Sequence, residues 1–159
     1  MNVHRQALPD DRAQELAHAA LRGAIAAMAM TGMRVVTVNL GIVKEPPPQQ
    51  VMRQRARGVL RAVPRRRRPS AIELVHWSYG AGGGVMFGML PDEIRRRAWA
   101  GPAYGLAVWL GFELGLAPAL GLSHARQPRP AERLGIALDH LIYGLVLSEF
   151  RARPQETLP

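Results

Sequence analysis

Apolar residues in this 159-residue chain gather in four long runs, separated by short segments that are rich in Pro, Arg and Gln. The core of a bilayer is about 30 Å thick, and a helix needs roughly 20 mostly apolar residues to cross it. Runs of that length cover residues 23–43, 71–90, 100–121 and 131–150. The pattern therefore predicts an all-α fold, a four-transmembrane-helix bundle that forms a single integral membrane domain over residues 1–159.

A soluble four-helix bundle is the alternative fold. Each helix of such a bundle should carry a polar face along its whole length. Residues 75–90 contain only His76, Ser78 and Tyr79 as polar side chains, and residues 98–112 contain none apart from aromatic ones. Because these two runs lack a polar face, lipid surroundings are favoured over water.

The distribution of basic residues predicts an orientation. Four spans place both chain ends on one side of the membrane and the loops 44–70 and 122–133 on the other. These two loops carry 12 of the 21 Lys and Arg residues, against eight on the opposite side. The positive-inside rule therefore places both loops in the cytoplasm. The cluster from Arg95 to Arg97, on the opposite side, argues against this orientation.

The basic loop 44–70 also carries an amphipathic pattern, with apolar residues at helical spacing on one face and arginines four residues apart on another. A short interfacial helix lying on anionic headgroups explains the pattern. The alternative is that the arginines only hold the loop inside the cell. Nucleic acid is not an expected partner, because no aromatic residues interleave with the basic run. The residues expected to bind anionic lipid or to set the topology are Arg53, Arg57, Arg61, Arg65, Arg66, Arg67 and Arg68.

Small residues recur every four positions on the first three runs, beginning with Gly23, Ala27 and Thr31. Such spacing forms a flat strip on which a second helix can approach closely, which is the usual packing surface in lipid. The strips predict a tight bundle, or else a homo-oligomer or a membrane partner that docks on one strip. The glycines expected to pack are Gly80, Gly84, Gly88, Gly101, Gly105, Gly111 and Gly115.

Short motifs recur between the two halves of the chain. The segments from His76 to Gly80 and from His140 to Gly144 both read H-x-x-Y-G, and the first and third runs end alike, in Leu-Gly at Gly41 and Gly121. The chain can therefore be interpreted as two helix hairpins in the same orientation, like the parallel repeats of small transporters. Bundles without an internal repeat also contain matches this short.

Each run holds ionisable residues at a similar depth from the side of the two basic loops. At 1.5 Å per helical residue they lie roughly 5–15 Å inside that surface. A charged residue at the centre of a span costs about 2.5–3.5 kcal/mol, so we expect Arg34 to pair with Glu113 or Asp139. Such a layer serves either as an ion network that fixes helix register, or as an ion or proton path or an anion site at Arg34. The predicted intramembrane polar layer consists of Arg34, Glu73, His76, Glu113, Asp139, His140, Tyr79 and Tyr143.

No complete catalytic or metal-binding motif is present in the sequence. Glu73 and His76 form an E-x-x-H motif of the kind that di-iron bundles use, but such sites need a second E-x-x-H and two further carboxylates. The chain also has no Cys, Walker loop, G-x-S-x-G or H-E-x-x-H. We therefore expect no metal, no cofactor and no enzymatic activity.

Six short segments carry a family resemblance: Met33-Arg34, the exit from Leu40-Gly41 to Pro48, His76 to Gly80, Gly101 to Gly105 with Trp109, Pro118 to Leu122, and His140 to Gly144. With these motifs the chain resembles a group of uncharacterised small multi-pass integral membrane proteins of high-GC actinobacteria, which are distantly similar to the YagU-like inner-membrane proteins. The resemblance covers about residues 20–150, and the long basic loop departs from the shorter loops of the wider group. It implies a multi-pass protein of the bacterial plasma (inner) membrane, and it supplies no activity or substrate.

These features leave three hypotheses for function. The first is a structural or accessory membrane protein that packs through its small-residue helix faces, and this is the expectation we carry forward. The second is a small transporter or channel that uses the polar layer around Arg34, Glu113 and Asp139. The third, an intramembrane enzyme, lacks a nucleophile and a complete acid–base set.

Overall fold

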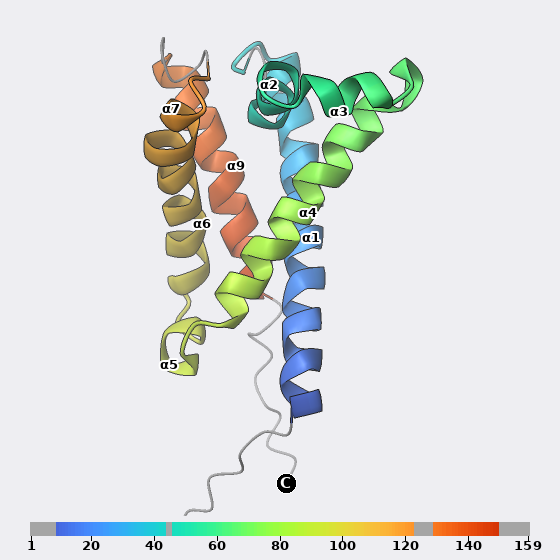
Figure 1. The fold of residues 1–159 in the computed structure, drawn as a ribbon. Helices are drawn as coiled ribbons and strands as arrows, with labels where there is room; N and C mark the ends of the chain where they lie inside the picture. Colours follow the sequence, from blue (N-terminus) through green and yellow to red (C-terminus); the bar gives the residue numbers. More distant parts are fainter. Residues whose placement is uncertain (1–8, 44–45, 123–128, 150–159) are drawn as a thin grey trace, which may run out of the picture.

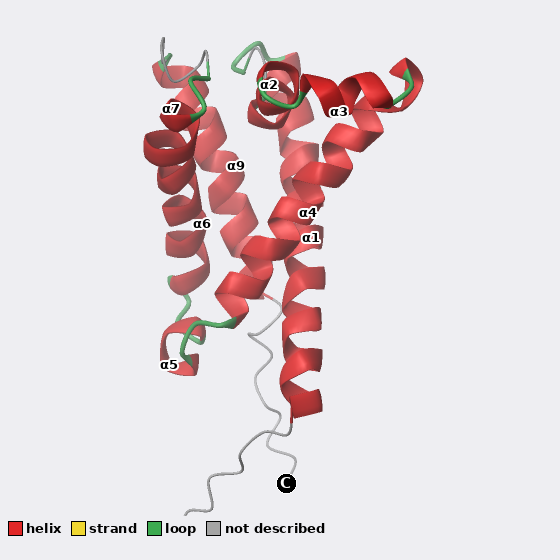
Figure 2. Ribbon diagram, viewed as in Figure 1, coloured by secondary structure: helices red, strands yellow, loops and turns green. Residues whose placement is uncertain are grey.

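The computed structural model describes residues 9–43, 46–122 and 129–149. Every regular element in these three ranges is helical (Figures 1 and 2). The prediction of an all-α chain is therefore confirmed for the part of the chain that the structure describes.

Four long helical stretches coincide with the four apolar runs. They are α1 (Pro9–Asn39), α4 (Arg68–Gly88), α9 (Pro130–Glu149), and a third stretch that opens with α6 (Ala100–Leu110). The third stretch continues through the π-helical segment η2 (Gly111–Leu116) into α7 (Ala117–Ala119) without leaving helical geometry. The shorter elements are α2 (Pro47–Gln54), α3 (Arg57–Ala62), the 3₁₀ turn η1 (Arg65–Arg67) and α5 (Asp92–Arg95).

The long helices form two antiparallel hairpins, α1 with α4 and α6 with α9 (Figure 1). Contacts between α1 and α9 join the two hairpins, whereas α4 leans away from α6 toward the end of the bundle that carries α2, α3 and α7. The start of α1 and the end of α9 lie toward the opposite end (Figure 1). This is the arrangement expected of four successive up-and-down helices.

Glycines set the close approach within both hairpins. A Cβ atom on Gly23 or Gly84 would overlap backbone atoms of the facing helix, and the same holds for Gly105 and Gly144 in the second hairpin. Only a residue without a side chain fits at these positions. Among the glycines predicted to pack, Gly80, Gly84, Gly88, Gly101 and Gly105 therefore lie in close contact with a facing helix. Around Gly111 and Gly115, by contrast, a Cβ would meet nothing within 4 Å.

The first and third helical stretches end in the same hydrogen-bonded turn. Gly41 and Gly121 have positive φ values of 68° and 59°. In each turn the glycine N–H bonds to the carbonyl three residues earlier, and the next N–H bonds to the carbonyl five residues before it, which is the Schellman pattern. The four bonds are Gly41 to Val38 (2.9 Å), Ile42 to Thr37 (2.9 Å), Gly121 to Pro118 (2.8 Å) and Leu122 to Ala117 (3.0 Å).

The basic loop is helical, but it does not form the single amphipathic helix that the spacing suggested. The backbone turns between α2 and α3, at Arg55 and Ala56, where φ is −116° and −112°. Arg53 therefore lies on one helix and Arg57 and Arg61 on the next, so the predicted continuous stripe is wrong. The two helices lie across the end of the bundle (Figure 1), which is where an interfacial segment is expected.

One helix among the described residues is long and apolar enough to cross a membrane by length and composition. It is the part of α1 from Arg12 to Asn39, and 33% of its apolar window is buried in the structure. Glycines and polar residues lower the apolar content of α4 and α9, and α6 ends after 11 residues where the π-helical segment begins. The helices thus match the four expected spans in position. Within the described residues, however, only α1 meets the criterion of length and apolar composition.

Candidate functional site: a polar layer and a cavity between the hairpins

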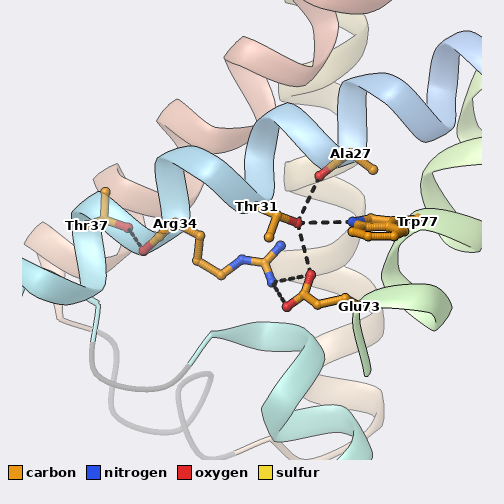
Figure 3. Close-up of polar contacts among 6 residues, drawn as sticks. All are labelled: Ala27, Thr31, Arg34, Thr37, Glu73 and Trp77. Carbon is orange, nitrogen blue, oxygen red and sulfur yellow. Dashed lines mark hydrogen bonds and ion pairs between the residues drawn. The ribbon is translucent and has the colours of Figure 1, made fainter. Parts of the chain in front are cut away.

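Arg34 on α1 forms an ion pair with Glu73 on α4 (Figure 3). Nη1 of Arg34 lies 3.1 Å from Oε1 and 3.4 Å from Oε2 of Glu73. The hydroxyl of Thr31 donates a 2.9 Å hydrogen bond to the other side of the carboxylate, and the indole N–H of Trp77 donates to that hydroxyl at 3.2 Å. The Arg34 side chain is only 7% exposed, so this network satisfies a buried cation inside the first hairpin.

The predicted partners of Arg34 were therefore wrong, because Glu73 takes the place expected of Glu113 or Asp139. Depth along a helix says how far a residue lies from the membrane surface, but the rotation of each helix decides which side chains meet. The glycine contacts bring α1 closest to α4, and the face of α4 that meets α1 carries Glu73. Arg34 accordingly finds its carboxylate within its own hairpin.

Glu113 forms its ion pair in the second hairpin. Its Oε1 lies 2.8 Å from Nε of Arg133, near the start of α9. The Glu113 side chain is 2% exposed, whereas that of Arg133 is 42% exposed. Glu113 lies in the π-helical segment, and π turns inside α-helices are frequent at functional sites.

Two tyrosine hydroxyls bind the hairpins to each other. Tyr143 on α9 donates a 2.7 Å hydrogen bond to the carbonyl oxygen of Gly80. Tyr104 on α6 donates an equally short bond, 2.7 Å, to the carbonyl oxygen of Gly83. The rings of Tyr104 and Phe87 also pack at a centroid distance of 5.1 Å. Tyr143 was predicted as a member of the polar layer, but both tyrosine hydroxyls donate to backbone carbonyl oxygens and not to the charged residues.

A cavity of about 730 Å³ lies between the hairpins, with its lining drawn from α1, α4, α6, η2 and α9. A smaller cavity of about 150 Å³ adjoins it beneath α2. His76, Tyr79 and His140 line both cavities, while Arg34 and Asp139 line the smaller one. Tyr143 lines the larger cavity, so the structure brings six of the eight predicted polar-layer residues to the walls of these two adjoining cavities.

Two buried polar atoms at this space have no hydrogen-bond partner within the described ranges: Nε2 of His76 and Oδ1 of Asp139. His140 differs, because its Nδ1 lies 2.8 Å from the Ile136 carbonyl oxygen on its own helix. Buried polar atoms are rarely left unpaired. His76 and Asp139 are therefore the side chains of this layer that are best placed to meet a ligand.

A metal site receives no support from the part of the chain that the structure describes. No group of three or more His, Cys, Asp or Glu side chains comes together there. In the E-x-x-H motif, the carboxylate of Glu73 contacts a guanidinium and His76 faces the cavity. The motif is thus divided between an ion pair and a cavity wall.

The arginines of the basic loop lie at the end of the bundle. Two of them bond within the loop: Nε of Arg57 to the Arg53 carbonyl oxygen at 2.7 Å, and Nε of Arg68 to that of Val63 at 3.2 Å. The exposed members of the predicted lipid-binding set are Arg53, Arg57, Arg61, Arg65, Arg66 and Arg67. A positively charged surface therefore faces outward at this end.

Sequence reasoning overlooked the hydrogen-bonding roles of Thr31 and Trp77 and the role of Arg133 as the partner of Glu113. Thr31 stood out only as a small residue in a packing strip. Arg133 was counted with the basic loop, although it falls within the fourth apolar run. The sequence did contain a signal for this pair, because Glu113 and Arg133 lie toward the same end of two adjacent apolar runs.

Comparison with known proteins gives no relative for this chain. No protein-family model matches it, and neither does any curated protein or solved structure. The resemblance to small multi-pass integral membrane proteins of high-GC actinobacteria therefore stays a prediction, and function has to be inferred from the geometry of this chain.

Proposed function

We propose that this chain is a four-span integral membrane protein of the bacterial plasma membrane with a structural or accessory role. The observation that carries the proposal is the distribution of side chains between inside and outside. Arg34, Glu113 and Asp139 are 3–6% exposed, whereas Leu114 and Leu134 are 70% and 71% exposed. A protein in water would leave its charges outside and cover its leucines, and the reverse arrangement suits lipid.

The helix contacts support the same proposal. Apolar contact contributes little between helices in lipid, so association there depends on close backbone approach at small residues and on polar contacts. Both hairpins use such contacts: Gly23 against Gly84 in the first, and Gly105 against Gly144 in the second. The exposed arginines at the end of the bundle are consistent with loops 44–70 and 122–133 facing the cytoplasm and anionic headgroups; residues 123–128 of the second loop lie outside the described residues.

A structural or accessory role is supported by how completely the packing faces are used. The strips on α4 and α6 are occupied within the chain, and the ion pair of Arg34 is closed by Glu73 and Thr31. The face at Gly111 and Gly115 remains open to a second copy or to a membrane partner.

Fractionation and topology mapping test the proposal together. We expect the full-length protein to stay in the membrane pellet after alkaline carbonate extraction. We also expect a fluorescent-protein fusion inserted after Pro64 to fluoresce in the cytoplasm, and alkaline phosphatase fused at the C-terminus to be active outside it. Recovery of the chain in the soluble fraction without detergent would refute the membrane location. The reversed reporter pattern would refute only the orientation.

A small transporter is the second candidate, favoured by the smaller cavity that Arg34, His76 and Asp139 line. Purified protein in liposomes with a pH-sensitive dye inside tests it. We expect proton or solute flux above that of empty liposomes, and an Asp139→Asn variant of normal abundance should reduce it. Flux equal to that of empty liposomes under every gradient would contradict the transporter candidate, and the structural role would be the one that remains.

A further inference from the structure

The larger cavity has the size and lining of a site for a small organic molecule. Its volume of about 730 Å³ falls within the range of roughly 300–1,000 Å³ that ligand pockets occupy. Apolar side chains and glycines form most of its wall, among them Gly82, Met86 and Val108. A molecule with a bulky apolar body fits this part of the space.

Aromatic side chains from four elements line the same cavity. Tyr79 comes from α4, Tyr104 from α6, Phe112 from η2 and Tyr143 from α9. The face of an aromatic ring attracts a cation, and the attraction grows when water is excluded. The wall is therefore suited to an apolar body that carries positive charge.

The polar end of the space holds a buried carboxylate, Asp139, without a direct ion pair within the described ranges. Arg34 and Asp139 both line the smaller cavity, but the charge of Arg34 is balanced by Glu73 at 3.1 Å. Asp139 is 5% exposed, forms no ion pair within the described ranges, and has an oxygen without a hydrogen-bond partner. A buried carboxylate in this setting is stabilised by a cation.

We propose that this space binds a lipophilic monocation, a molecule with an aromatic or alkyl body and one quaternary or protonated centre. The body occupies the larger cavity, and the positive centre lies toward Asp139 and the tyrosines. The proposal deepens the transporter candidate and depends on the proposed membrane location for the route by which such a molecule enters. An anionic ligand is the competing occupant, since Arg34 lies at the same end.

Two ions of nearly identical shape and opposite charge distinguish these occupants. Full-length protein purified in a neutral detergent is dialysed to equilibrium against tetraphenylphosphonium or tetraphenylborate, with protein-free micelles as the baseline. We expect saturable binding of tetraphenylphosphonium and only micellar partitioning of tetraphenylborate. Saturable binding of tetraphenylborate alone, or of neither ion, would overturn the proposal.

Matched variants locate the site. Asp139→Asn should weaken tetraphenylphosphonium binding about 30-fold or more, the loss expected when a buried charge partner is removed. Glu132→Gln changes another buried carboxylate of α9 that lines neither cavity, and it should leave binding intact. Unchanged affinity in a folded Asp139→Asn variant would contradict the assignment.

A second pair of variants does not depend on the stability of Asp139→Asn. Gly82 and Gly32 are both exposed helical glycines with nothing within 4 Å of a Cβ, but only Gly82 lines the cavity. Gly82→Leu should therefore abolish binding by filling the space, and Gly32→Leu should not. Equal binding by both variants would place the cation elsewhere. Because binding is measured in micelles, a soluble protein that binds the cation would refute only the membrane location.

Discussion

The hydroxyl of Tyr143 lies 2.7 Å from the carbonyl oxygen of Gly80 and donates a hydrogen bond to it across the two hairpins. The two residues occupy the corresponding tyrosine and glycine positions of the two H-x-x-Y-G motifs. A motif of the second hairpin thus bonds to the same motif of the first. Tyr79, the other tyrosine of this pair of motifs, is 53% exposed and faces the cavity.

We expect Tyr143→Phe to lower the free energy of unfolding by about 1 kcal/mol, the net value of a typical intramolecular hydrogen bond. Tyr79→Phe removes the same atom from a side chain that is half exposed, and it should change stability by less than about 0.5 kcal/mol. Thermal unfolding of both variants in the same detergent measures the difference. Equal losses in the two variants would mean that the bond to Gly80 contributes nothing.

The ion pair of Arg34 and Glu73 should show strong coupling. Arg34→Gln and Glu73→Gln each leave one buried charge without its partner, at a cost of about 3 kcal/mol. The double variant removes both charges and should recover much of that loss. Cellular abundance and thermal unfolding of the three variants give the coupling energy.

The ion pair of Arg95 with the more exposed Asp92 is the control for these variants. Asp92 is half exposed, so Asp92→Asn should cost less than about 1 kcal/mol. Additive effects of Arg34→Gln and Glu73→Gln would show that the two side chains act independently, contrary to the geometry in Figure 3.

A single methyl group should disrupt the second hairpin at Gly105. The Cβ of Gly105→Ala would overlap the backbone carbonyl of His140, so α6 and α9 would have to separate. We expect loss of folded protein, seen as lower abundance and faster proteolysis in membranes. Gly115→Ala adds the same methyl group where nothing lies within 4 Å and should be tolerated. Normal folding of Gly105→Ala would show that the helices are not in close contact at this point.

The same substitution should have opposite effects at two glycines of the first helical stretch. Gly41 has a φ of 68°, which a side chain disfavours, so Gly41→Ala should destabilise the protein by about 1 kcal/mol. Gly32 lies inside α1 with open space around it, and Gly32→Ala should stabilise it by about 0.5–1 kcal/mol. Thermal unfolding measures whether each variant is more or less stable than the unchanged protein. Destabilisation by Gly32→Ala would contradict the helical geometry described for that position.

The positions of the helices could be predicted because they depend on local sequence. Apolar runs, the Pro-rich exits and the glycines at positions 41 and 121 each act within a few residues along the chain. The close glycine contacts could be anticipated for the same reason, since four-residue spacing already implies a flat face. Their partners could not be assigned, because several strips had the same spacing.

The contacts between side chains could not be predicted from spacing alone. Arg34, Glu73 and Asp139 lie at similar depth, and only the rotation of α1 against α4 selects Glu73 as the partner. The break between α2 and α3 and the π-helical turn around Glu113 have no simple sequence signal either. Each arises when backbone geometry adjusts to tertiary packing. The unpaired oxygen of Asp139 is likewise a property of the assembled helices.

The divergence of α4 from α6 has a mechanical consequence. Among the described residues, the hairpins contact each other along the α1–α9 seam, and two tyrosine bonds join α4 to the second hairpin: Tyr143 to Gly80 and Tyr104 to Gly83. A rigid tilt of the first hairpin about that seam would move α4 relative to α6 and would stretch both tyrosine bonds. In the proposed membrane location, such a tilt would change access to the cavity while both glycine interfaces stay intact.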